Sequence, residues 1–141
     1  MLYTKILVPF DGSPGSWKAL RKAILLAREH GAETVALSAE AHLPHYPATV
    51  GEVQEEKEQE NAYFAKEQAK AITVASEQGV DLKTEIVPGH AAQTILHYAQ
   101  AGGFDLIVIG HSGHSGVWGV LLGSTTKRVV DHATCDVLVV R

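Results

Sequence analysis

Three glycines and two hydroxyl residues in the last third of the chain are the residues best suited to chemistry. Gly110, Gly113 and Gly123 follow an apolar stretch in the pattern G-2x-G-9x-G, and Ser124 and Thr125 come directly after the last glycine. Glycine permits positive φ and close approach of the backbone to an anion, and the first N–H groups of a helix have no partner within it. The segment therefore predicts a phosphate-binding loop in which residues 124 and 125 add hydroxyl donors.

Asp11 is the second candidate, because it ends an apolar run and precedes Gly12, Ser13 and Pro14. Its carboxylate can accept a hydrogen bond from an adenine amino group or a ribose hydroxyl. It can also hold a divalent cation, such as Mg²⁺, that bridges phosphates. The alternative is a structural role as a turn residue or helix cap, and spacing alone does not separate these interpretations.

Positioning these residues requires an alternation of strands and helices, and the hydrophobic pattern predicts one. Strands are expected at residues 5–10, 34–39, 82–87, 105–109 and 137–140. Helices are expected from Pro14 to the stop at Gly31, from about Glu52 to Gly79, after Pro88 and Gly89, and at residues 124–132. In the second helix, the apolar stripe is assigned to Ala62, Ala65, Ala69, Ile72 and Ala75. The proline-containing segment from His42 to Gly51 is expected to be an irregular loop.

Five strands alternating with four helices indicate an α/β fold with a parallel, doubly wound sheet and helices on both faces. Ligands of such sheets bind beyond the carboxyl ends of the strands, where the strand order reverses. Asp11 ends the first strand, and Gly110 ends the fourth. If these two strands are neighbours, the carboxylate faces the glycine loop.

Length and composition limit the classes of protein that fit. The 141 residues are 45% apolar with a formal charge of −4, which predicts a single domain spanning residues 1–141. No basic cluster favours nucleic acid, and no apolar run reaches the roughly 20 residues of a membrane span. The N-terminus lacks the apolar region of a signal peptide, so we expect no membrane association and a cytoplasmic location.

Signals for catalysis are missing from the sequence. There is no G-x-x-x-x-G-K-[ST] element and no G-x-S-x-G elbow, so we expect binding without a catalytic residue and at most slow nucleotide hydrolysis. His111 and His114 lie three residues apart, but no carboxylate or thiolate stands at ligand spacing. They are interpreted as loop imidazoles that face solvent, and their role stays open.

Several segments together resemble the universal stress protein family of the UspA type, in its ATP-binding subgroup. The resemblance covers essentially the whole chain. Its carriers are Lys5 to Ser13, Asp105 to Gly110, Leu121 to Ser124 and Val137 to Arg141, and the subgroup's signature G-2x-G-9x-G-[ST] fits Gly110, Gly113, Gly123 and Ser124.

The resemblance implies a Rossmann-like sheet of order 3-2-1-4-5, as in the adenine nucleotide alpha hydrolase-like group. It also implies that ATP, or AMP or ADP, binds with adenine near the first two strands, with Mg or Mn as an accompanying metal. The implied binding residues are Pro9, Asp11, Ala39, Ile109, Gly110, Gly113, Gly123, Ser124 and Thr125. Many members have an arginine between the first two glycines, where this chain has His111 and Ser112, so that phosphate contact is absent here.

Two functions follow from this resemblance. The first is an adenine-nucleotide-binding stress-response or signalling protein with slow or no hydrolysis. The alternative is an interaction module of the same fold that binds no nucleotide. For either, the resemblance implies a homodimer formed through the last strand, at Val137, Leu138, Val139 and Val140, an apolar edge that would otherwise favour aggregation.

Overall fold

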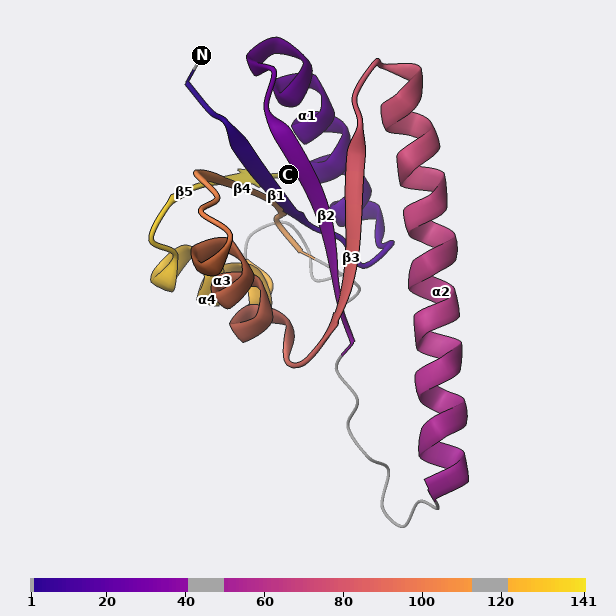
Figure 1. Cartoon of the computed structure of the whole chain (residues 1–141). Coiled ribbons are helices and arrows are strands. Elements are labelled where there is room, and N and C mark those ends of the chain that lie inside the picture. The colour runs from indigo at the N-terminus through magenta and orange to yellow at the C-terminus, as the bar shows by residue number, and fades with distance from the viewer. Residues whose placement is uncertain (1, 41–49, 113–121) are drawn as a thin grey trace.

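A parallel five-stranded sheet lies between two pairs of helices (Figure 1). This computed structural model describes residues 2–40, 50–112 and 122–141. The strand order is β3-β2-β1-β4-β5, so the predicted doubly wound fold and its order are confirmed. The strands are β1 (Lys5–Pro9), β2 (Glu33–Glu40), β3 (Leu82–Pro88), β4 (Leu106–Gly110) and β5 (Asp136–Val140). The helices are α1 (Pro14–His30), α2 (Val50–Glu77), α3 (Ala91–Ala101) and α4 (Ser124–His132).

The first helix begins and ends where its capping residues require. Ser13 is the N-cap of α1, and its hydroxyl accepts a hydrogen bond from the Ser16 N–H at 3.3 Å. Pro14 occupies the first turn, where its missing N–H costs nothing. Gly31 ends the helix with φ of 65°, a left-handed conformation that glycine adopts without steric penalty.

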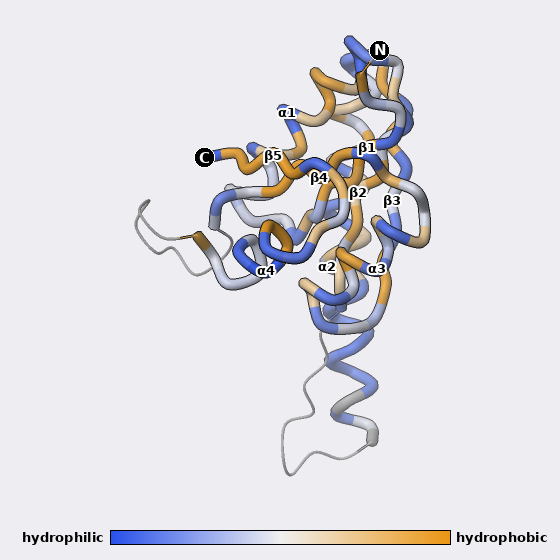
Figure 2. Tube along the Cα trace, turned by 90° about the vertical axis from the view of Figure 1, so that its left-hand side faces the viewer, coloured by the Kyte–Doolittle hydropathy of each residue, from blue (hydrophilic) through white to orange (hydrophobic). Residues whose placement is uncertain are grey.

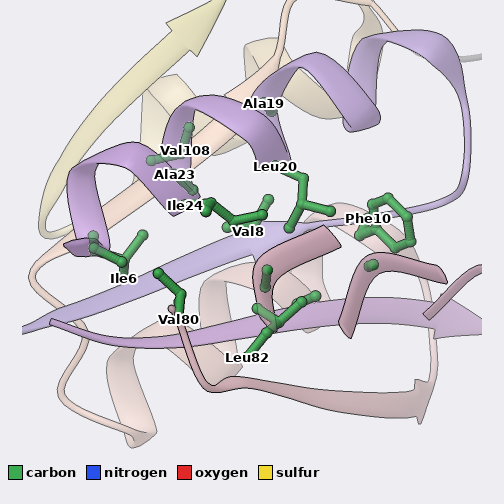
Figure 3. Close-up of a cluster of buried hydrophobic side chains, with 14 of the residues drawn as sticks. Ile6, Val8, Phe10, Ala19, Leu20, Ala23, Ile24, Val80, Leu82 and Val108 are labelled. Carbon is green, nitrogen blue, oxygen red and sulfur yellow. The ribbon is translucent and has the colours of Figure 1, made fainter. Parts of the chain in front are cut away.

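Each face of the sheet has its own apolar core. Ile6, Val8 and Phe10 of the β1 region face α1 and α2, where they pack with Leu20 and Ile24 (Figure 3). The alternate residues face α3 and α4, and this second core contains Leu7, Val35, Leu37, Ile95, Ile107 and Val129. Because β1 is buried on both faces, its sequence is continuously apolar rather than alternating.

The prediction of which face of α2 is buried is wrong. Ala62, Ala65, Ala69 and Ile72 are exposed, and of the five predicted residues only Ala75 is buried. The face toward the sheet instead carries Phe64, Gln68, Ala71 and Ala75. Alanine is too weakly apolar to determine which face of a helix is buried. The ring of Phe64 and the buried side chain of Gln68 therefore determine which face of α2 lies against the sheet.

A polar seam joins α2 to the sheet beside the cavity described below. Gln68 is buried, and its side-chain Nε2 donates to Ser38 Oγ at 2.9 Å and to the Glu85 carbonyl at 2.8 Å. The Ser38 hydroxyl in turn donates to the carbonyl of Phe10 at 2.7 Å. The two Gln68 bonds fix α2 against β2 and β3, and the Ser38 bond joins this contact to the residue that follows β1.

The N-terminal half of α2 extends past the carboxyl edge of the sheet and is hydrophilic (Figures 1 and 2). Its charged start, from Glu52 to Glu60, is largely exposed, as a solvated first part of a helix should be. The helix begins at Val50, inside the segment expected to be a loop, and the rest of that segment, residues 41–49, lies outside the described residues. In the described part of the chain, no helix is both long and apolar enough to cross a membrane.

Candidate functional site

A cavity of about 260 Å³ opens at the carboxyl edge of the sheet, where β1 and β4 meet. This is the point at which the strand order reverses, and it is the usual ligand site of such sheets. The first turns of α1, α3 and α4 surround it together with the ends of β1, β2 and β4. The lining residues are Pro9, Phe10, Asp11, Ser13, Ser16, Leu37, Ala39, Ala91, Ile95, Ile109, Gly110, Ser112, Gly123, Ser124, Thr125 and Thr126.

The structure brings the sequence-predicted site residues together around this one cavity. Pro9, Asp11, Ala39, Ile109, Gly110, Gly123, Ser124 and Thr125 all line it. The remaining predicted residue, Gly113, lies outside the described residues, as does His114. Segments more than 100 residues apart in the chain thus share one concave surface, from Pro9 to Thr125.

The cavity has an apolar half that sequence reasoning described only in part. Leu37, Ala39, Ala91, Ile95 and Ile109 supply this surface. The contribution of α3 was missed because its first residues carry no glycine signature. The order of the elements could have indicated this contribution. Since α3 follows the carboxyl end of a parallel strand, its first turn lies at the same edge of the sheet as the cavity.

Asp11 occupies the turn between β1 and α1. Its Oδ1 accepts a hydrogen bond from the Ser13 N–H at 2.9 Å. This bond gives Asp11 the structural role of a turn residue. Gly12 follows with φ of 81°, and the Tyr63 hydroxyl of α2 donates to the Asp11 carbonyl at 3.2 Å. Asp11 also lines the cavity, so the turn contact leaves the ligand-binding interpretation open.

The start of α4 presents hydrogen-bond donors to the cavity. Gly123 is the N-cap and has no side chain with which to cap this end, and the N–H groups of the first turn have no partner within the helix. Thr126 is 4% exposed, and its hydroxyl donates to the Gly110 carbonyl at 2.7 Å. That bond holds the first turn of α4 against the end of β4, which fixes the direction of its N–H groups.

The expectation that the motif glycines adopt positive φ is wrong for Gly110 and Gly123. Gly123 has φ of −58°, and Gly110 lies in the strand β4, so neither adopts the positive φ that the sequence argument invoked. At Gly110 the requirement is space, because a Cβ atom would lie 2.7 Å from the carbonyl oxygen of Gly15 in α1. Close packing of a strand and a helix therefore accounts for this glycine.

His111 also differs from its prediction as a solvent-facing loop residue. The residue is 8% exposed and is not among the described residues that line the cavity. The strand pairing continues through it, since its N–H donates to the Val140 carbonyl at 2.8 Å and its carbonyl accepts from the Gly123 N–H at 3.0 Å. These two bonds hold His111 within the fold, while Ser112 faces the cavity.

The charged and metal-ligating groups near the cavity are few. Across residues 2–40, 50–112 and 122–141, no three histidine, cysteine, aspartate or glutamate side chains gather as a metal site would require. Asp11 is the one acidic side chain among the described lining residues. Among the described residues, Asp11 is therefore the one carboxylate that a metal ion at this cavity could take as a ligand.

The order of the sheet and the cavity at its reversal point define a doubly wound α/β protein with a small-molecule-sized site of mixed polarity. Within that class, the chain belongs to the universal stress protein family, whose model matches residues 2–141. This match confirms the family that the sequence segments indicated.

Three similar proteins illustrate the relationship. Universal stress protein MJ0531 of Methanocaldococcus jannaschii is 37% identical over 147 residues, which cover 99% of this chain and 83% of that protein. The structure of UspA from Lactobacillus plantarum has a TM-score of 0.92 at 36% identity and covers 100% of this chain and 99% of that one. A universal stress protein in complex with cAMP has a TM-score of 0.78 at 26% identity, with 100% and 99% covered.

Proposed function

We propose that this chain binds an adenine nucleotide in the cavity at the carboxyl edge of the sheet. The observation that carries the proposal is the convergence on one cavity of Asp11, Ala39, Gly110 and the first turn of α4. These residues come from separate elements, and a purely structural role would not require them to share a concave surface. The nucleotide-bound state would then be the form read by a partner in a stress response or in signalling.

The polarity of the cavity suits the two ends of a nucleotide. A base fits the apolar half, between Ala39, Ile95 and Ile109, and Asp11 can accept from its amino group or from a ribose hydroxyl. The phosphate end fits the first turn of α4, where unpaired N–H groups and the partial positive charge of the helix dipole favour an anion. Ser124 and Thr125 add hydroxyl donors there.

A solved relative supports the class of ligand. The universal stress protein crystallised with cAMP shares 26% of its residues with this chain over its whole length. A shared fold and family with a nucleotide-binding protein favour nucleotide binding here over the alternative of an interaction module without a ligand. ATP, ADP and AMP are the candidates, with Mg or Mn accompanying the longer phosphate chains.

Turnover of the nucleotide is proposed to be slow or absent. Phosphoryl transfer depends on cations that stabilise charge on the transferred group and on a residue that orients the nucleophile. The described lining of the cavity contains no lysine or arginine. Asp11 can share a metal ion with phosphates, and no catalytic residue is assigned.

The test is calorimetric titration of adenine nucleotides into protein that has been extracted to remove any bound nucleotide and shown to be folded. The substitution Ala39→Leu would extend a side chain into the apolar half of the cavity, and we expect about tenfold weaker binding. Ala69→Leu, on the exposed face of α2, is the matched control and should bind as the wild type does. Failure of every adenine nucleotide to bind the folded wild type would refute the proposal.

We also propose that the chain forms a homodimer through β5. This strand is an edge of the sheet, with one neighbouring strand, and Leu138 on it is 37% exposed. Val137, Val139 and Val140 are half-buried beside it. An apolar edge with unpaired backbone groups is a surface that a second copy of the strand can cover.

A further inference from the structure

A second hollow lies on the face of the sheet that carries α3, separate from the cavity described above. It is a groove of about 530 Å³ between the C-terminal half of α3 and the strands β2 and β3, and β3 is an edge of the sheet (Figure 1). The described lining residues of the two sites have no member in common. The volume falls within the roughly 300–1,000 Å³ of small-molecule sites, so the groove can hold a ligand of its own.

Part of the groove is apolar and aromatic. Val35 and Phe104 line it, are 4% and 7% exposed, and belong to the core between the sheet and α3. The ring of Tyr98 lies beside that of Phe104, with 5.6 Å between the centroids and 34° between the planes. The Tyr98 hydroxyl makes no hydrogen bond with the part of the chain that the structure describes. This surface suits the apolar body of a ligand.

Both lysines among the described lining residues already have partners. Lys5 Nζ lies 4.7 Å from the centroid of the Phe104 ring and donates a hydrogen bond to the Gly102 carbonyl. Lys83 Nζ lies 3.1 Å from Glu33 Oε1. The contact of Lys5 shows that this surface holds an ammonium group against an aromatic ring. Neither lysine is left as a free cation that would attract an anionic ligand.

Glu85 supplies the charge that remains. Among the described lining residues, it is the one carboxylate without a hydrogen bond or an ion pair. Its backbone carbonyl accepts from Gln68 Nε2 at 2.8 Å, which fixes the strand beneath the side chain. Burial raises the pKa of the nearby Tyr98 hydroxyl, and the negative charges of Glu85 and Glu33 raise it further. The same charges favour a cation beside the tyrosine ring.

We propose that this groove binds a small organic cation, a primary ammonium group on an apolar body. The ammonium group donates to the Glu85 carboxylate, and the body lies over Val35 and Phe104, with the Tyr98 ring beside it. A hydrogen bond between two charged groups and a cation–π contact both favour an ammonium over a neutral or anionic ligand of the same shape. The inference goes beyond nucleotide binding and does not depend on it, because the two sites have separate linings.

The experiment follows the backbone amide signals of the ¹⁵N-labelled full chain by NMR during addition of phenethylamine. The neutral 2-phenylethanol and the anionic 3-phenylpropionate carry the same ring and serve as matched ligands. At about pH 8 the amine is protonated and an ordinary imidazole is neutral. We expect the amine to shift the signals of Val35, Glu85 and Tyr98 and to bind about threefold or more tightly than either matched ligand.

Three variants test the role of charge. Glu85→Gln keeps the shape of the side chain, and we expect about threefold weaker binding of the amine with no change for the alcohol. Lys83→Gln removes the partner of Glu33 and should tighten amine binding by about twofold. Glu55→Gln removes an exposed carboxylate from the projecting half of α2 and should bind as the wild type does.

The same chemistry could reach the groove as a lysine side chain of a protein. N-acetyl-lysine amide presents that side chain, and we expect it to bind more weakly than phenethylamine, because its amide groups gain nothing from the apolar surface. Tighter binding of N-acetyl-lysine amide would overturn the assignment to a free amine.

Other results would overturn the site itself. These are equal affinities for the amine and the alcohol, signal shifts confined to the lining of the first cavity, or unchanged amine binding in a folded Glu85→Gln variant. Saturating AMP should leave the amine affinity unchanged, and competition between the two ligands would place the amine in the first cavity. Failure of AMP to bind would refute the proposed nucleotide function and leave the amine site standing.

Discussion

The backbones of Gly110 and Gly15 are in direct contact, which joins the end of β4 to the first turn of α1. A Cβ atom on Gly110 would lie 2.7 Å from the Gly15 carbonyl oxygen, and one on Gly15 would collide with the carbonyl oxygen of Ser112. Two elements that border the cavity are thus held at a separation that only glycine permits. The pair is a structural requirement for the site, independent of any ligand.

The first prediction concerns this contact. Gly110→Ala should lower the free energy of unfolding by about 1–3 kcal/mol even without nucleotide, because rigid backbone atoms crowd the new methyl group. Thermal and urea unfolding of the ligand-free protein measures the effect. Gly79→Ala serves as the comparison. A Cβ atom at residue 79 would meet nothing within 4 Å, so any loss of stability there comes only from placing an alanine at a φ of 75°. Wild-type stability in Gly110→Ala would contradict the packing explanation.

The second prediction concerns the polar seam beneath α2. Gln68→Ala leaves Ser38 Oγ and the Glu85 carbonyl without their partner, and buried groups without partners cost about 1–3 kcal/mol in stability. Chemical denaturation measures the loss. Gln93→Ala, on the exposed side of α3, should change stability by less than about 0.5 kcal/mol. Equal effects of the two substitutions would mean that the seam contributes nothing.

The strand and helix pattern was predictable because β1 and β4 are continuously apolar and glycines mark the helix ends. The site residues were predictable for a related reason, since the carboxyl ends of parallel strands necessarily share an edge. This geometry, together with the family resemblance, was enough to select Asp11, Ala39 and Gly123 without any coordinates.

What could not be predicted depends on contacts across the sheet. The phase of α2 is set by Phe64 and Gln68, and a row of alanines at helical spacing gave no reliable indication of the buried face. The burial of His111 depends on pairing with Val140, which lies 29 residues further along the chain. The crowding at Gly110 depends on α1, so a glycine that packs closely looked like one that binds phosphate.

The third prediction concerns Thr126 as a positioning residue for α4. Thr126→Val removes the hydroxyl that donates to the Gly110 carbonyl and should cost about 1 kcal/mol in stability. It should also weaken AMP binding, because the first turn of α4 loses its fixed direction. Thr126→Ser keeps the hydroxyl and should restore affinity in calorimetric titration. A valine variant with wild-type affinity would show that α4 is held by other contacts.

The fourth prediction is a pH dependence from Asp105, just before β4. Burial raises its pKa, but hydrogen bonds from the Thr4 and Lys5 N–H groups and from the Thr4 hydroxyl outweigh burial, so its pKa lies below its ordinary value. A carboxyl with a lowered pKa stabilises the fold above the unfolded-state pKa of about 3.9, and the stabilisation is lost as the pH falls through the folded-state pKa.

Unfolding of the wild type and Asp105→Asn, followed from about pH 7 to about pH 2, measures this contribution. The wild type should be the more stable at neutral pH, and the difference should shrink below about pH 4. Asp81→Asn, at an exposed carboxylate, should follow the wild type throughout. A difference between wild type and Asp105→Asn that stays constant over this range would exclude the proposed linkage.

The fifth prediction concerns the proposed dimer. Leu138→Lys places a charge on the exposed edge strand and should shift the protein to a monomer in size-exclusion chromatography with light scattering. Leu25→Lys, on an exposed leucine of α1, should leave the oligomeric state unchanged. A wild-type chain that is monomeric at high concentration would refute the dimer directly.

A crystal structure of the protein with AMP would show whether the cavity at the reversal point of the sheet binds the nucleotide. We expect the base to lie against Ala39 and Ile95, and the phosphate to lie within hydrogen-bond distance of the first N–H groups of α4. A nucleotide found elsewhere, such as in the groove beside Lys83 and Tyr98 at the C-terminal half of α3, would contradict nucleotide binding in this cavity.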